Sequence, residues 1–600
     1  MPVTTEDLKA TNVRWDLTPF FPGLPSEAYE AALGTFTQNT DVFVRDWKSK
    51  IETAKGALSP NELHLCLANY DQLIGEISKI RSFVYCLASA DTQNELYQKE
   101  RGRITEVGSH FRQKTLFLDI QLKQVPDSVF QTWMDSSELA EWQYHLKTLR
   151  QERPFTLTEP EESWITIKSL TGKNAWVQFY DQITSRFQYS IPEVSDKPLN
   201  ESEVRSLRYS EKREIRELAT RALAKNYEEN SPVLTPIYEN IFKDHLVESQ
   251  KRGYQSPISP VNLGNDLSDE VVETLLRATE KHYPLAQRYY NLKKKVLGLS
   301  DLKSWDLYAP LTKNTHQVSW PEAKTLVTEA YRYFDPEFGS LTEQFFEKNY
   351  IEAENRPGKR GGAYCITFGS KENPRVFMTY TASPRDISTI AHEFGHAIHF
   401  FYSKNQRNLN GHAVLPLAET ASVFGEMLLT KHYLAKVDSK EQKRQLLAQK
   451  IEDMTATVFS QNVYIRFEQK AYQALSEKKL GTEDFSAIWS EEFKKFYGGT
   501  IDYYEGSRFI WQAIPHFIHT RFYCYSYTFG ELLSLSLYGL YEQNPTEEFK
   551  TKFKALLTNG CTNSPQALLS PFGIDLSQES FWNQGFKTME SFIDEFEKTL

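Results

Sequence analysis

The part of the sequence with the clearest chemical meaning is a pair of histidines that flank a glutamate. His392 and His396 are four residues apart in the segment His-Glu-Phe-Gly-His. On a helix this spacing places both imidazoles on one face, one turn apart, and a zinc ion about 2.0–2.1 Å from each nitrogen fits between them. Glu393 lies about 100° further round the helix, where its carboxylate can reach a metal-activated water without binding the metal. The segment therefore predicts two metal ligands and one general base.

A zinc ion in such a site needs a third protein ligand, and several residues compete for that role. His399 shares a helix face with His392, but seven residues of helical rise, about 10.5 Å, separate the two. Glu419 lies in the segment 417–429, which predicts a second helix with an apolar stripe on another face. Because burial of an unpaired carboxylate is costly, a zinc ion on two neutral histidines would be a suitable partner for Glu419. We predict Glu419 as the third ligand, with His412 in a nearby loop as the alternative.

Two further carboxylates are predicted to support the ligands without binding the ion. Glu426 lies two helical turns beyond Glu419 and cannot reach the same ion. Asp386 is the third residue of a helix that starts with Ser383 at its cap and Pro384 at its first position, so its first task is to cap that helix. Carboxylates behind the ligands can orient them, and a solvated face or a salt bridge is the alternative for Glu426.

The elements that must position these residues are mostly helical, with one strand-forming region. Residues 362–368 and 375–381 flank a turn-like segment and predict a hairpin directly before the histidine-bearing helix. We expect strand 375–381 to align a peptide through main-chain hydrogen bonds. Elsewhere apolar residues recur at helical spacing over residues 63–77, 204–251 and 268–297, and less cleanly over residues 116–122. The sequence therefore predicts a mainly α fold with a small sheet beside the histidine-bearing helix.

A second group of candidate residues lies in the aromatic-rich segment 497–530. Hydrolysis of a peptide by a metal-activated water builds negative charge on the former carbonyl oxygen, and a neutral donor held in place stabilises that charge. His516 and one or more of Tyr523, Tyr525 and Tyr527 have suitable side chains. Aromatic packing in a core is the alternative from the residues alone.

Composition excludes several classes of function. The net charge of -10 gives no electrostatic basis for binding nucleic acid or an anionic membrane. The five cysteines are odd in number and form no Cys-x-x-Cys pair, which argues against a disulfide framework and a thiolate zinc site. No signal peptide starts the sequence, and no run of about 18 apolar residues occurs in it. We expect a cytoplasmic protein, and the sequence does not disclose its oligomeric state.

These motifs together resemble a known family. The pairing of His392-Glu-Phe-Gly-His396 with Glu419-Thr-Ala-Ser-Val-Phe-Gly-Glu426 resembles the thimet-type oligopeptidases of the M3 zinc metallopeptidases, above all the bacterial oligoendopeptidase F branch. The matching stretches extend over most of the chain and include residues 14–19, 252–257, 514–518 and 522–525.

The resemblance implies a two-lobed, zincin-like helical body around a deep channel with one zinc ion on its floor. It implies an N-terminal lobe over residues 1–200 and a catalytic region over 201–600, with short unfolded peptides as substrates. His392, His396 and Glu419 would bind the zinc and Glu393 would be the base.

By the same resemblance His516 and a downstream tyrosine, Tyr523 or Tyr527, would contact the substrate and the developing oxyanion. The predicted activity is the hydrolysis of internal peptide bonds in short oligopeptides. The alternatives are a peptide-binding protein with a structural zinc ion and no turnover, and a helical scaffold without metal.

Overall fold

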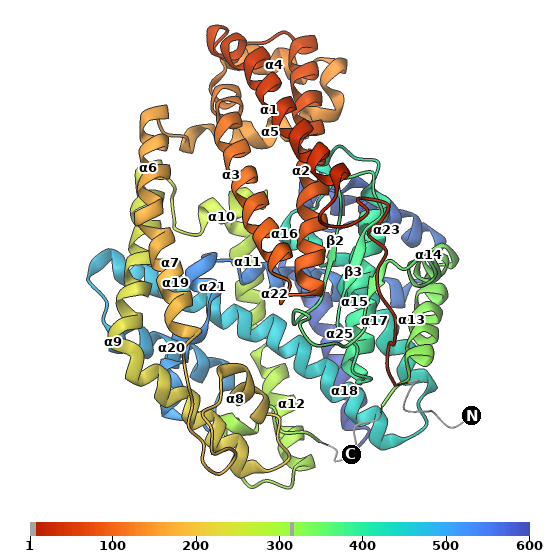
Figure 1. The fold of residues 1–600 in the computed structure, drawn as a ribbon. Helices are drawn as coiled ribbons and strands as arrows, with labels where there is room; N and C mark the ends of the chain where they lie inside the picture. The colour runs from red at the N-terminus through yellow and green to blue at the C-terminus, as the bar shows by residue number, and fades with distance from the viewer. Residues whose placement is uncertain (1–7, 312–316) are drawn as a thin grey trace. The chain divides into compact units, whose positions relative to one another are not determined.

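The computed structural model describes residues 8–311 and 317–600, and the chain packs as two compact units (Figure 1). The first unit contains residues 8–156, 317–436 and 540–575, and the second contains residues 157–311, 437–539 and 576–600. Each unit is therefore assembled from three stretches that are far apart in the sequence. The predicted boundary at residue 200 divides the chain into two continuous regions, 1–200 and 201–600, instead of into packed units. This division stays a prediction.

The first unit is built from helices and one small sheet. Its helices are α1 (Glu27–Thr53), α2 (Pro60–Ala90), α3 (Glu95–Gln124), α4 (Asp127–Met134), α5 (Gln143–Gln151), α13 (Trp320–Phe334), α14 (Pro336–Glu347), α15 (Pro384–Ser403), α16 (Leu415–Ala418), α17 (Thr420–Lys436), α23 (Glu547–Asn559) and α24 (Pro565–Leu569). Local signals set several helix starts. Ser59, for example, accepts from the backbone of Glu62 at 3.4 Å, and the Glu62 carboxylate accepts from the backbone of Ser59 at 3.0 Å.

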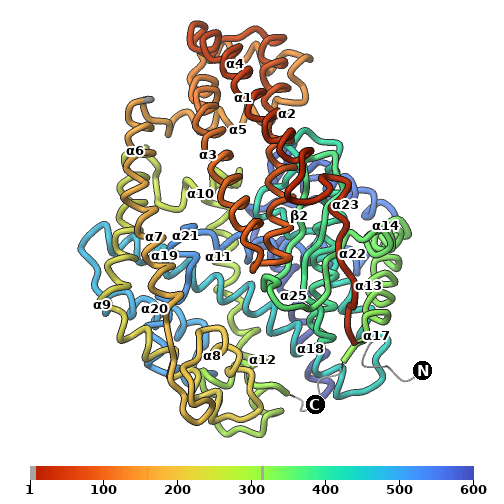
Figure 2. The backbone as a smooth tube through the Cα atoms, in the orientation of Figure 1, coloured from red at the N-terminus to blue at the C-terminus, as the bar shows by residue number. Residues whose placement is uncertain are grey.

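The second unit is helical throughout its described regular elements, and Figure 2 shows the long course of α9 through it. Its helices are α6 (Glu159–Thr171), α7 (Lys173–Thr184), α8 (Glu201–Leu207), α9 (Arg213–Arg252), α10 (Ser259–Gly264), α11 (Asp269–Lys281), α12 (Tyr283–Val296), α18 (Lys440–Met454), α19 (Gln461–Glu477), α20 (Thr482–Tyr497), α21 (His516–His519), α22 (Tyr525–Gln543, up to residue 539) and α25 (Glu579–Glu597). A π-helical segment, η5 (Thr455–Ser460), joins α18 to α19.

The predicted helical stretches are confirmed, but two of them are broken. The stretch 204–251 becomes α8 and α9, with residues 208–212 between them. The stretch 268–297 becomes α11 and α12, which part at His282. Pro284 near the start of α12 accounts for the second break, because a proline restricts the residue before it and lacks a backbone donor. The spacing of hydrophobic residues alone does not predict such a break between helices.

The sheet has three short strands in the order β1-β3-β2, and it lies beside α15 (Figure 1). Strand β2 (Tyr364–Ile366) pairs antiparallel with β3 (Arg375–Phe377), which confirms the predicted hairpin in shortened form. Strand β1 (Ile351–Glu352), which was not predicted, pairs parallel with β3 on its other side. A two-residue strand has too short a pattern to be recognised in a sequence.

Helix α15 packs closely on α17, and two glycines allow it. A Cβ atom at Gly395 would lie 2.3 Å from the backbone oxygen of Ala421. A Cβ atom at Gly425 would lie 1.9 Å from the hydroxyl oxygen of Tyr331, which itself donates to the backbone oxygen of Ala391 at 2.6 Å. At Gly395 a side chain would have to push α15 and α17 apart, and at Gly425 it would displace Tyr331 of α13 and come within 3.0 Å of the backbone oxygen of Ala391 in α15. This close approach brings Glu419, directly before α17, and Glu426, within it, to the histidines of α15.

The described helices include none that is long and apolar enough to cross a membrane. Three of the five cysteines, Cys66, Cys86 and Cys524, are buried. The mainly helical class with a small sheet beside α15 is thus confirmed, whereas the channel implied by the resemblance stays a prediction.

Candidate metal centre

Helix α15 begins where the sequence predicts, and its cap uses Asp386. The Ser383 hydroxyl accepts from the Asp386 backbone at 3.3 Å, and Asp386 Oδ2 accepts from the Ser383 backbone at 3.1 Å. The same carboxylate oxygen also accepts from the backbone and hydroxyl of Thr381 at 2.6 and 2.8 Å. These contacts are those of a capping residue that ties the end of the hairpin segment to α15. The predicted support of the metal ligands by Asp386 stays a prediction.

The structure brings His392, His396 and Glu419 together. The two Nε2 atoms are 3.2 Å apart, and Glu419 Oε2 lies 3.3 Å from His392 Nε2 and 3.4 Å from His396 Nε2. Within the described chain these three residues form the one group of three or more potential ligands whose donor atoms converge. His412, the alternative third ligand, lies instead with its Nε2 3.4 Å from the Thr367 hydroxyl.

The three donor atoms fit a tetrahedral zinc ion. Donors about 2.0–2.1 Å from one tetrahedral centre lie roughly 3.3 Å from one another, close to the separations in this group. Two imidazoles and a carboxylate are the donor set of zinc sites that keep one position open for water or substrate. The residues present therefore suit a zinc ion, and a metal is implied by both the chemistry and the arrangement of this group.

Glu426 contacts His392 at the ring nitrogen opposite the one that faces His396 and Glu419. The distance between His392 Nδ1 and Glu426 Oε1 is 2.6 Å. An ionised carboxylate only accepts, so Nδ1 carries a proton, and Nε2 is the nitrogen that faces His396 and Glu419. Burial opposes protonation of His392, but hydrogen bonds to Glu419 and Glu426 outweigh it and raise its pKa above the usual value. A cation at Nε2 would satisfy the same carboxylates without that second proton.

The sequence predicts one continuous helix around Glu419, but the structure does not have it. The segment is divided into α16 and α17, and Glu419 stands at the joint between them. Its Oε2 accepts from the Ser422 hydroxyl at 2.7 Å. Burial alone would raise the pKa of Glu419, but hydrogen bonds from His392 and His396 lower it well below the usual value. This carboxylate is therefore ionised and held in place from two sides.

Glu393 is buried next to this group and one of its oxygens has no partner. Its side chain is 5% exposed, and among the described residues no hydrogen-bond partner exists for Oε2. Burial raises the pKa of Glu393, although His392 and His396 oppose the shift. An unpartnered carboxylate in such a place is costly unless a ligand or water uses it. The position matches that of a proton acceptor beside a metal site.

The expectation that strand 375–381 aligns a peptide is wrong, because β3 is the central strand. Its pairing with β1 continues past its end, where the backbone nitrogens of Met378 and Tyr380 donate to residues 352 and 353 at 2.9 Å. On its other side β3 pairs with β2. The outer edge of the described sheet next to α15 therefore belongs to β2. Burial raises the pKa of Cys365 in β2, and the negative charge of Glu393 raises that pKa further. Strand β2 therefore lies near the Glu393 carboxylate.

In the second unit, His516, Tyr523 and Tyr527 form a cluster. The ring of His516 stacks on that of Tyr523 with centroids 5.5 Å apart, and the Tyr527 hydroxyl lies 3.4 Å from His516 Nε2. Tyr525 points elsewhere, since its hydroxyl accepts from Asn265 at 2.6 Å in a buried position. Burial lowers the pKa of His516, with a smaller contribution from His519. The cluster therefore offers neutral donors.

Glu468 fixes the backbone of this cluster, and the sequence analysis missed it. Its Oε1 accepts from the Phe522 backbone at 2.9 Å, and Phe522 has a φ of 53°, in the left-handed region. A bulky residue rarely adopts this conformation, so the turn before Tyr523 is strained and needs support. The signal available in the sequence was a carboxylate on the apolar stripe of α19, between Ile465 and Tyr472. Such a residue needs a partner, but the partner is 54 residues away.

The fold and the convergence of two histidines and a carboxylate, next to the buried Glu393, are those of a metallopeptidase. The comparisons agree with this class. The family model described as peptidase family M3 matches residues 206–588, and the one described as Oligopeptidase F matches residues 121–189.

Relatives match over nearly the whole chain. Oligopeptidase PepF of Bacillus subtilis is 25% identical over 572 residues, which cover 93% of this chain and 84% of that protein. A crystal structure from Chlamydophila abortus has a TM-score of 0.86 at 23% identity and covers 98% of both chains. The oligoendopeptidase-F of Enterococcus faecium has a TM-score of 0.69 at 19% identity, over 94% of this chain and 99% of that one. These structures support the fold.

The chain belongs to peptidase family M3. It is a metalloendopeptidase whose relatives are oligoendopeptidase F proteins.

The contact between Glu426 and His392 predicts a loss of zinc affinity when it is removed. Glu426→Leu should weaken zinc binding by about 10–100-fold, because the imidazole loses the acceptor that fixes its ring and tautomer. Glu426→Gln, which keeps an acceptor oxygen, should lose less. The measurement is competition for zinc with a fluorescent chelator. Glu329→Gln is the matched control, since Glu329 also contacts a histidine, His432, but away from the metal centre. Unchanged affinity in Glu426→Leu would contradict the role.

The buried Glu468 predicts a pH dependence of stability. Burial raises its pKa to about 8, opposed by the Phe522 backbone and the charge of Arg521. Tyr472 and Cys524 are the titratable groups that respond to its charge. Between the unfolded and folded pKa the native state holds more protons, so the free energy of unfolding falls as pH rises from about 5 to 8, by at most about 1.4 kcal/mol per pH unit.

Glu468→Gln removes this titration, and the pH dependence of its unfolding free energy should be flatter over the same range. Urea unfolding at several pH values measures the effect, with the exposed Glu491→Gln as control. Parallel curves for Glu468→Gln and the unmodified chain would show that Glu468 is ionised throughout.

Proposed function

We propose that the chain is a zinc-dependent endopeptidase that cleaves internal bonds of short oligopeptides, with His392, His396 and Glu419 as zinc ligands. The observation that carries this proposal is the convergence of three donor atoms, 3.2–3.4 Å apart, beside the unpartnered carboxylate of Glu393. A structural zinc site is usually closed by four protein ligands, whereas this group offers three in the described chain.

The roles of the residues follow from their positions. A zinc ion supplies Lewis acidity, which lowers the pKa of water and polarises the scissile carbonyl. Glu393 accepts the proton of the attacking water and later gives it to the leaving amine. Glu426 holds the His392 ring in place through Nδ1. Each step of proton movement therefore uses a side chain of α15, and the orientation of that helix depends on α17.

We assign the alignment of the substrate to the outer edge of β2. This edge lies next to α15, and an extended peptide can add to it as a further strand through main-chain hydrogen bonds. Such binding reads the backbone and not the side chains, which suits an enzyme that acts on varied short peptides. Cleavage preference would then come from pockets beyond the strand.

His516, Tyr523 and Tyr527 are proposed as donors to the substrate and to the developing oxyanion. They form one cluster with partly exposed side chains, and the lowered pKa of His516 keeps its ring neutral. Neutral donors suit an oxyanion, because they gain strength as charge develops and do not form an ion pair with the ground state. Action in the cytoplasm, on unfolded peptides, remains the accompanying proposal.

Glu393→Gln tests the base. The variant should bind zinc normally and lose several orders of magnitude in kcat, because an amide cannot accept the proton. Peptide digestion followed by mass spectrometry, with zinc content measured in the same samples, gives both quantities. Retained turnover in a zinc-loaded Glu393→Gln protein would exclude this base. Absence of turnover in the unmodified, zinc-loaded chain would favour a peptide-binding protein instead.

Tyrosine substitutions test the second cluster. Tyr527→Phe should lower kcat by about 10²–10³-fold if its hydroxyl is an oxyanion donor, with zinc binding unchanged. Tyr523→Phe distinguishes which of the two clustered hydroxyls carries the larger share. Tyr525→Phe is the matched control, because its hydroxyl is buried against Asn265. Equal kcat in Tyr523→Phe, Tyr527→Phe and the control would remove the cluster from the mechanism.

A further inference from the structure

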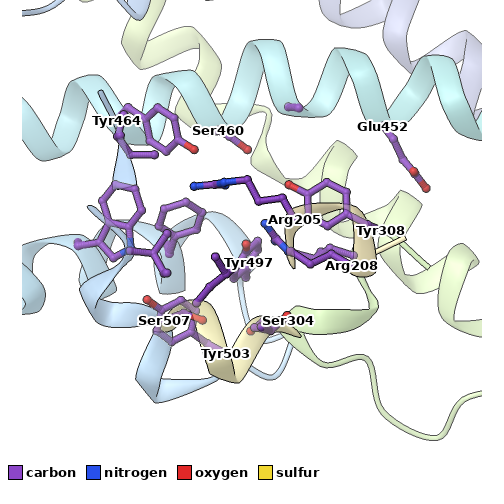
Figure 3. Close-up of a pocket in the computed structure, with 18 of the residues that line it drawn as sticks. Arg205, Arg208, Ser304, Tyr308, Glu452, Ser460, Tyr464, Tyr497, Tyr503 and Ser507 are labelled. Atoms are coloured by element: carbon purple, nitrogen blue, oxygen red, sulfur yellow. The ribbon is translucent and has the colours of Figure 1, made fainter. Parts of the chain in front are cut away.

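The second unit contains a cavity that the proposed peptidase function does not use. Its volume is about 180 Å³, and all of its lining residues belong to the second unit (Figure 3). An engineered cavity of about 150 Å³ binds benzene, so this one has room for a single aromatic ring with a short substituent. None of the predicted catalytic residues lines it. The chemistry of its walls indicates what it can bind.

One wall carries two arginines, Arg205 in α8 and Arg208, which directly follows the end of that helix. Arg205 is neutralised by Glu201, whose Oε1 accepts from Arg205 Nε at 2.7 Å and whose Oε2 accepts from Tyr227 at 2.8 Å. Glu452 also lines the cavity, but Lys293 neutralises it at 2.6 Å. Both carboxylates are therefore occupied by a cation of their own.

Arg208 is the charge that remains. Among the described residues its buried Nε has no hydrogen-bond partner, and its guanidinium lies 4.4 Å from the centroid of the Tyr308 ring. Figure 3 shows the nitrogens of Arg205 and Arg208 pointing into the ring of lining side chains. A buried cationic donor without a partner is costly, and an anion in the cavity would supply one.

The opposite wall is aromatic. Trp489 packs against Tyr464 and Phe493, with centroids 5.4 and 4.7 Å away. Burial raises the pKa of Tyr464 although Arg205 and Arg208 oppose it, so this hydroxyl is a neutral donor. A flat apolar group can stack on this wall while a negative group faces the arginines.

The helical segment 452–464, which runs from α18 through η5 into α19, lines the cavity with one residue in every four. Glu452, Ala456, Ser460 and Tyr464 all line the cavity and are spaced by four residues. On a regular α-helix each such step turns the side chain by about 40°, so the last would point about 120° away from the first. The π-helical segment η5 lies between them and, with its wider turn, changes that rotation. Segments of this kind are frequent at functional sites.

We propose that this cavity is a binding site for a small aromatic carboxylate, with the carboxylate on Arg208 and the hydroxyls of Ser460 and Tyr464, and the ring against Trp489 and Phe493. Two sources share this chemistry: a free aromatic acid, and the C-terminal carboxylate of a short peptide that ends in an aromatic residue. The site is independent of the metal centre, so it stands or falls separately from the peptidase function.

Isothermal titration calorimetry of the full chain tests the proposal with four probes. 3-Phenylpropionate carries both features, acetate carries only the charge, and 3-phenylpropionamide carries only the ring. N-acetylphenylalanine represents the end of a peptide. We expect 3-phenylpropionate to bind at least about tenfold more tightly than acetate or the amide, since it alone uses both walls. Tighter binding of N-acetylphenylalanine would identify the peptide end as the source.

Variants locate the binding. Arg208→Gln should weaken binding of 3-phenylpropionate by about tenfold or more. Arg221→Gln is the matched control, because Arg221 also lies over aromatic rings, 5.3 Å from Trp305 and 4.7 Å from Tyr504, but is paired with Glu217 and does not line the cavity. Equal affinities for acid and amide, or no binding of the acid at millimolar concentration, would overturn the proposal even if Arg208→Gln fails to fold. Unchanged affinity in a folded Arg208→Gln protein would place the ligand elsewhere.

Discussion

The metal centre depends on how closely α15 and α17 approach each other. At Gly395 the distance from a would-be Cβ to the backbone of the facing segment is 2.3 Å, which leaves room for a hydrogen only. The proposed ligands are divided between the two sides of this contact, with both histidines on α15 and Glu419 directly before α17. Because the donors must converge to within a few tenths of an ångström, a wider helix separation would leave the carboxylate out of reach of the imidazoles. Gly395 is therefore as necessary to the proposed site as the residues that we propose as ligands.

How much of this could be predicted from the sequence varies with the range of the interaction. The histidine pair and the start of α15 are local patterns, fixed by helical periodicity and by a cap within four residues. Glu419 could be proposed from the sequence, because a buried carboxylate on an apolar helix needs a partner. The close approach at Gly395 and the partner of Glu468 could not be predicted, since each depends on a contact between segments far apart in the chain. No local pattern specifies which distant backbone a glycine or a carboxylate will meet.

The sheet shows a different limit of sequence reasoning. The hairpin was predicted from two strand-like runs, yet which strand forms the edge depended on β1, a two-residue strand without a recognisable pattern. Its parallel pairing with β3 moves the open edge to β2 and thereby changes which segment can receive a peptide. A small element can thus reverse a functional inference while leaving the fold class unchanged. The tyrosines show another limit, because the residues alone left Tyr523, Tyr525 and Tyr527 open. The structure places the rings of Tyr523 and Tyr527 together, whereas the hydroxyl of Tyr525 is buried against Asn265.

The metal centre and the cavity of the second unit share one feature, a buried polar atom without a hydrogen-bond partner among the described residues. A folded chain satisfies most of its buried donors and acceptors, so an unsatisfied one persists only where a ligand, water or ion completes it or where function repays the cost. Glu393 Oε2 is such an atom in the first unit, and Arg208 Nε is one in the second. The first is an acceptor beside three converging metal donors, and the second is a donor beside aromatic rings. The sign of each unsatisfied group is the reason for the ligand that we propose there: a proton donor such as water at the carboxylate, and an anion at the guanidinium.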